Sequence, residues 1–174
     1  MSLILARPGV IDWRNPLPSP PVDARPAKDL SRIPVLPRDP ERDPPTPTTS
    51  TLWMLQLLGP LREILDMEKE GPCPKDFSKV DRIHQALIDL EETKPPVLRT
   101  ENPDTRWDHL PELYWLPYKR AYYGGLVQFS IMCLHRPYIF HRRASREAAL
   151  KAGITMLEAQ RQSFEGLPPQ SWRK

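Results

Sequence analysis

Apolar residues recur at helical spacing in four stretches of the chain, all of them after residue 48. Side chains three or four residues apart form the stripes of the first two stretches: Leu52, Leu55, Leu58, Leu61 and Leu65, then Val80, Ile83, Leu87 and Leu90. The third stretch is rich in aromatic residues and the fourth in alanine. This spacing is typical of helices that bury one face. It predicts helices from about residue 49 to Glu70, from Ser78 to before Pro95, from Pro111 to Pro137 and from Ser145 to before Gly166.

Capping and helix-breaking residues refine these four helices. The hydroxyl groups of residues 48–51 are expected to cap the first helix, and Ser78 with Asp81 resembles a capping box for the second. Ser145 is the expected N-cap of the fourth. The residues expected to kink or weaken the helices are Gly59 and Pro60 in the first, and Pro117, Gly124 and Gly125 in the third.

Proline dominates the segment before these helices. Of the 23 prolines in the 174 residues, twelve lie in the first 48. Each proline removes a backbone donor and restricts φ, so residues 1–48 are expected to form the end of an element followed by an extended linker or strap. No stretch has the two-residue alternation of a sheet. The sequence therefore predicts an all-α fold, an irregular helical domain of about four helices over residues 49–174.

Cysteine content and charge limit the classes of protein that fit. Cys73 and Cys133 are too few for a disulfide framework or a four-cysteine zinc site. No apolar stretch is long enough to cross a membrane. The net charge is +3, but residues 49–108 carry −4 and residues 109–174 carry +6. A basic final third permits contact with nucleic acid, acidic lipid or an acidic protein face, or pairing with the acidic part of the same chain.

The familiar signatures of catalysis do not occur. There is no glycine-rich phosphate loop, no GxSxG elbow and no HExxH motif. His135 and His141 are poorly spaced as metal ligands, His84 has the place of a structural histidine, and Asp104 and Asp108 have no partner base. We expect no enzyme activity, no catalytic or metal site and no cofactor in this chain.

The densest positive cluster surrounds Pro137. Arg142, Arg143 and Arg146 stand where a helix begins, a position that disfavours cations unless acidic groups lie nearby. They are the candidate partner contacts, and carboxylates of this chain or of a partner are preferred over nucleic-acid phosphate. Arg136 is likewise expected to pair with carboxylates, because a guanidinium beside apolar surface needs acceptors.

The residues around this cluster also resemble a known family. Leucine, histidine, arginine, proline and an aromatic residue follow one another at Leu134, His135, Arg136, Pro137 and Tyr138, and then come Ser145, Ala149, Ala152 and Gly153. This block is similar to the fungal-specific transcription factor regulatory domain, the middle homology region of zinc binuclear-cluster activators, including the xylanolytic type. The family usually has cysteine where Ala149 stands and an alanine pair where Ala152 and Gly153 stand. Trp107, Pro95-Pro96 and residues 2–12 add weaker similarity.

The resemblance implies a nuclear protein that regulates transcription through helical packing, by contacts with protein partners, an effector or the rest of its parent factor. Only the distal part of the family's domain is present, so this chain is expected to be a fragment. The family's zinc cluster, which binds DNA, is absent, and DNA would be reached only through that module. Without covering helices, the wide apolar stripes are expected to leave exposed surface and to favour self-association. The alternative is a small helical protein-interaction module with a basic patch and no transcriptional role.

Overall fold

The computed structural model describes residues 19–24, 36–70 and 76–165. Four α-helices account for most of them: α2 (Pro47–Glu70), α3 (Ser78–Glu92), α4 (Leu116–His135) and α5 (Arg143–Glu165). Two short 3-10 turns, η1 (Pro96–Leu98) and η2 (Pro111–Leu113), lie between α3 and α4, and a third, η3 (Arg136–Tyr138), lies between α4 and α5. Within the described ranges the only β contact is an isolated bridge between Ala24 and Pro37. The predicted all-α fold is confirmed.

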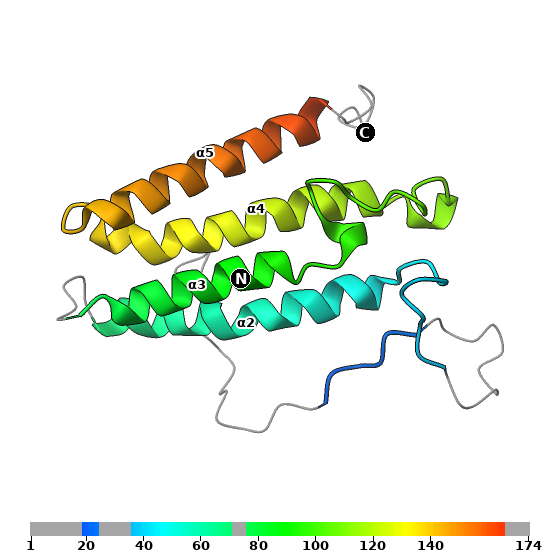
Figure 1. Cartoon of the computed structure of the whole chain (residues 1–174), viewed down its shortest axis with the longest axis horizontal. Helices are drawn as coiled ribbons and strands as arrows, with labels where there is room; N and C mark the ends of the chain where they lie inside the picture. Colours follow the sequence, from blue (N-terminus) through cyan, green and yellow to red (C-terminus); the bar gives the residue numbers. More distant parts are fainter. Residues whose placement is uncertain (1–18, 25–35, 71–75, 166–174) are drawn as a thin grey trace.

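The helices stack side by side with α5 on the outside (Figure 1). α5 packs along α4, α4 packs on α3, and α2 covers α3 and part of α4. The buried apolar side chains form one continuous cluster: Trp53, Leu57, Ile64, Met67, Val80, Ile83, Leu87, Leu90, Val97, Leu98, Leu113, Leu116, Tyr123, Val127, Ile131, Leu134, Tyr138 and Ala152. The core therefore lies among α2, α3 and α4, and α5 is a one-sided outer layer. None of the helices in the described part of the chain is both long and apolar enough to cross a membrane.

A polar network fastens the N-terminus of α2. Thr46 and Thr49 cap one another, since each backbone N–H donates to the other's hydroxyl oxygen. Both hydroxyls also donate to the Asp23 carboxylate, at 2.6 and 2.8 Å, and the Arg38 guanidinium donates to it at 3.0 Å. Burial raises the pKa of Asp23, but these hydrogen bonds outweigh burial and hold that pKa below its usual value. The cap thus includes Thr46, which lies outside residues 48–51, where capping hydroxyls were predicted. Through Asp23, the same hydrogen bonds connect residues 19–24 to the helix.

The structure refines two local predictions about α2 and α3. Pro60 lies inside α2, which continues past it without a restart, because packing of the buried face maintains the helix on both sides of the lost hydrogen bond. The expected capping box of α3 does not form. Instead, the Asp76 carboxylate accepts hydrogen bonds from the backbone N–H and the hydroxyl of Ser78.

The start of α4 also differs from the prediction. Pro111 opens the separate turn η2, and α4 begins at Leu116, so Pro117 lies in the first turn, where its missing N–H costs nothing. Gly124 does more than weaken the helix. A Cβ placed there would lie 2.4 Å from Thr100 Oγ1, so the glycine lets the loop after η1 approach α4 closely.

Candidate functional site

The residues that carry the family resemblance meet at the corner between α4 and α5. α4 ends at His135, the turn η3 follows at once, and α5 begins at Arg143. Pro137 belongs to η3, where its fixed φ suits the tight turn that ends the predicted third helix. The side chains of Leu134 and Tyr138 are buried, and the Tyr138 ring meets Phe77 edge to face with its centroid 5.5 Å away. The corner is therefore fixed to the start of α3 as well.

A chain of hydrogen bonds crosses this corner and joins three helices. His135 Nδ1 lies 3.0 Å from the Ser145 hydroxyl, and His135 Nε2 lies 2.9 Å from Nδ1 of His84 on α3. Ser145 is fully buried and His135 almost so. Ser145 lies inside the first turn of α5 and does not act as its N-cap, contrary to the sequence prediction, because its hydroxyl is used across the corner. The histidine and the serine of the family block are thus direct partners.

Both imidazoles are held in the neutral form. Burial, together with the nearby His84 ring and the Arg142 cation, lowers the pKa of His135 to about 4, while Asp81 opposes the change. Burial is also the main cause that lowers the pKa of His84, with Asp81 opposing and Lys151 and Arg142 adding to the lowering. Neutral rings suit both contacts, because each neutral imidazole has one nitrogen that donates and one that accepts.

Two of the arginines next to the corner, Arg142 and Arg143, form ion pairs within this chain. Arg142 donates to Asp81 on α3 at 2.8 Å and lies over the Phe77 ring, 4.9 Å from its centroid. Arg143 pairs with Glu147 one turn later at 2.7 Å, and Arg146 donates to the carbonyl oxygen of Ile139 at 3.0 Å. The preference for carboxylates of the same chain therefore holds for Arg142 and Arg143.

The prediction for Arg136 is wrong. Its side chain is exposed, and among the described residues it forms no ion pair with any carboxylate. The turn η3 directs it away from the core, so water solvates the guanidinium and no acceptor is needed. The pairing expected for Arg136 belongs to Arg142, six residues later, and to Arg120 on α4.

The small residues of the block have unequal roles. Ala152 is buried, Ala149 is half-buried, and Met156 of α5 lies 3.9 Å from a Cβ placed at Gly125. Gly153 is different, because a Cβ placed there would have no neighbour within 4 Å. The predicted close approach therefore applies to Ala152 and not to Gly153, which lies beside the contact with α4.

Three polar residues that fasten the helices were not predicted. Arg120 donates to the Val97 and Asp104 carbonyl oxygens, each at 2.8 Å, and grips both carboxylate oxygens of Asp108 at 2.6 and 2.7 Å. Lys94 is fully buried, with its ammonium 2.6 Å from Glu91 and 4.9 Å from the centroid of Trp53. Asp23 is the third. Arg120 could have been noticed in the sequence as a single cation among apolar residues. The sequence did not show that Asp108 is its partner.

The geometry of the corner suits fastening better than catalysis. The Ser145 hydroxyl and His135 resemble a nucleophile and its base, but both are enclosed by the surrounding helices, so no substrate could reach the hydroxyl in this arrangement. In the ranges that the structure describes, no three side chains of the metal-binding types come together. What the corner does is hold α3, α4 and α5 in one relative orientation.

Comparison of this chain with models of known protein families, with curated proteins and with solved structures finds no match.

Proposed function

We propose that this chain is part of the regulatory domain of a fungal transcription factor and acts in the nucleus by presenting helical surfaces to protein partners or to the rest of its parent factor. The observation that carries the proposal is the His135–Ser145 hydrogen bond. These two residues belong to the sequence block that resembles the family, and they are ten positions apart. Their hydrogen bond gives the block a structural role, which is to hold the end of α4 against the start of α5.

Three other residues of the block support the same role. Leu134 and Tyr138 anchor the corner in the core, and Ala152 lets α5 lie close to α4. A sequence motif with a structural role is expected to contain residues that pack in one place, as these do. Arg142 and Arg143, which could otherwise approach phosphate, are paired within the chain, and this favours contact with protein over contact with DNA.

A transcriptional reporter tests this proposal. The chain is inserted between a heterologous DNA-binding domain and an activation domain in a fungal host, and reporter output is compared with the same fusion lacking it. We expect a several-fold change, in either direction, that Ser145→Ala largely abolishes by loosening the corner. His141→Ala is the matched control, because His141 is an exposed residue of the same turn. An unchanged output from a fusion that is folded and nuclear would contradict the proposal.

The alternative, a helical interaction module without a transcriptional role, is favoured by one observation. Phe140 is 84% exposed, and the exposed residues Arg136, His141 and Arg146 lie near it in the sequence. An exposed aromatic ring among cations suits an acidic protein surface. Under this alternative the reporter would not respond, whereas Phe140→Ala with Arg136→Gln would weaken binding to an acidic peptide.

A further inference from the structure

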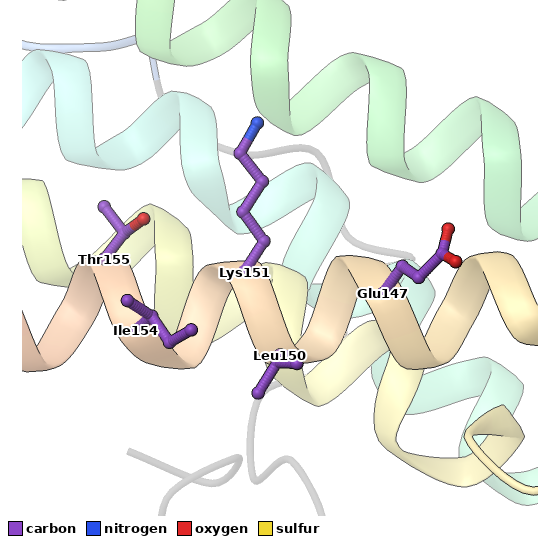
Figure 2. A pocket seen from close by; sticks show the side chains of 5 residues that line it. All are labelled: Glu147, Leu150, Lys151, Ile154 and Thr155. Atoms are coloured by element: carbon purple, nitrogen blue, oxygen red, sulfur yellow. The ribbon is translucent and has the colours of Figure 1, made fainter.

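The outward face of α5 carries an apolar stripe that nothing in the described structure covers. Leu150, Ile154 and Leu157 are 65%, 48% and 62% exposed, although α5 buries Ala152 against α4. A contiguous group of large exposed apolar side chains is unusual on a monomer and marks an interaction surface. Figure 2 shows Leu150 and Ile154 projecting from α5. With Glu147, Lys151 and Thr155 of the same helix, they line an open hollow of about 290 Å³.

The spacing of this stripe is that of a helix pairing with another helix. The steps from Leu150 to Ile154 and from Ile154 to Leu157 are four and three residues, the alternation of a coiled-coil seam. Glu147 and Arg143 continue the seam toward the start of α5, and Arg161 continues it toward the end. An apolar centre thus has a charged segment on each side.

The charges at the two ends are arranged symmetrically about Ile154. Arg143 pairs with Glu147 at 2.7 Å, and Arg161 pairs with Glu165 at 3.0 Å. Glu147 and Arg161 each lie seven residues from Ile154, and Arg143 and Glu165 each lie eleven from it. The charges seven residues from Ile154, and those eleven residues from it, therefore have opposite signs on the two sides.

We propose that the α5 stripe binds the same stripe of a second copy of this chain, with the two α5 helices antiparallel and Ile154 at the twofold axis. In that arrangement Glu147 faces Arg161 of the second copy, and Arg143 faces Glu165 of the second copy. Because the interface has twofold symmetry, each contact occurs twice. Leu150, Ile154 and Leu157 form its apolar part.

Charge complementarity selects this occupant and orientation. A parallel pair would place every charge opposite its own copy, which is repulsive at each end. The stripe is flanked by two cations, Arg143 and Arg161, and two anions, Glu147 and Glu165, so it does not attract nucleic acid or an anionic membrane. A self-complementary charge pattern around an apolar centre suits a second copy.

Sedimentation velocity on the complete 174-residue chain tests the proposal. At about 100 μM, well above a micromolar Kd, we expect a dimer. Glu147→Arg should weaken it at least tenfold, because the introduced guanidinium would then face Arg161 of the other copy. The double variant Glu147→Arg with Arg161→Glu should restore dimerisation, because opposite charges again face each other. The single variant Leu150→Lys should abolish it.

The double variant separates the interface from any effect within the helix. It breaks both intrahelical pairs, Arg143–Glu147 and Arg161–Glu165, so a loss caused only by helix destabilisation would be greater in the double variant than in the single one. Circular dichroism checks that each variant stays helical. A monomeric wild-type chain, or a dimer that Leu150→Lys and Glu147→Arg leave intact, would overturn the proposal. A dimer lost in Glu147→Arg and not restored in the double variant would overturn the antiparallel arrangement.

Discussion

His135 Nε2 lies 2.9 Å from His84 Nδ1, so a single contact between two imidazoles, 51 residues apart in the chain, joins the end of α4 to the middle of α3. The ring centroids are 5.0 Å apart and the rings cross edge to face. Since the other nitrogen of His135 bonds to Ser145 of α5, this pair is the link between the inner helices and the outer one. Its protonation state therefore bears on the stability of the whole corner.

Stability is expected to fall as the pH drops from about 6.5 toward 4. An unfolded histidine binds its proton near pH 6.5, whereas burial lowers the pKa of His135 in the fold to about 4, so the unfolded state takes up more protons in this window. The loss over the window is on the order of 3 kcal/mol. Urea unfolding at several pH values measures it.

Comparing the variant His135→Gln with the wild type tests whether His135 causes this pH dependence. The glutamine keeps a polar group at the corner without titrating, so the slope of stability between about pH 6.5 and 4.5 should flatten even though overall stability is lower. His141→Gln should leave the slope unchanged, because His141 is exposed. If stability depends on pH with the same slope in the wild type and in His135→Gln, then His135 does not cause the pH dependence.

Arg120 is expected to be the most important polar residue for fastening the loop before α4. Arg120→Ala would leave the Val97 carbonyl and Asp108 without their shared donor, and should lower the free energy of unfolding by about 3 kcal/mol. Arg120→Lys should recover little, since an ammonium cannot grip both oxygens of Asp108. Arg106→Ala is the matched control. Its pair with Asp104 is exposed, and we expect a change below about 1 kcal/mol.

Gly124 and Gly125 should respond in opposite ways to alanine. At Gly125 the new methyl group makes an ordinary contact with Met156, so the better helix propensity should stabilise the chain by up to about 1 kcal/mol. At Gly124 it would meet Thr100 Oγ1, and Gly124→Ala should be less stable than Gly125→Ala by about 2 kcal/mol. Adding Thr100→Ala to Gly124→Ala should remove most of that difference, which thermal melts of these variants and the wild type would reveal.

Asp23 is expected to stabilise the first turn of α2 against local unfolding. In Asp23→Ala the hydroxyls of Thr46 and Thr49 and the Arg38 guanidinium lose a common acceptor, and we expect a loss of about 2 kcal/mol. Hydrogen exchange at the backbone amides of residues 48–50 should accelerate more than exchange in α3. Glu41→Ala, at an exposed position of the same segment, is expected to change neither quantity. Unaltered exchange in Asp23→Ala would mean that the Thr46–Thr49 box suffices alone.

Helix content and approximate helix positions followed from the sequence because they depend on local spacing. Ile83 and Leu87 lie on one face of a helix wherever the rest of the chain is placed, and Pro95 limits α3 through its own backbone preferences. The same reasoning identified Pro137 as the end of the third helix. The block of residues at the α4–α5 corner was also recognised in the sequence, as a resemblance and not as a geometry.

Only the tertiary structure decided which polar groups meet. Capping of α2 through Asp23, the grip of Arg120 on Asp108, and the link from Ser145 through His135 to His84 join residues 10 to 51 positions apart, and no periodic pattern encodes such pairs. Arg136 and Arg142 look equivalent in the sequence, yet the turn η3 sends one into water and brings the other to Asp81. Burial is a property of the assembled helices, and burial determines both which of these groups need a partner and which imidazoles stay neutral.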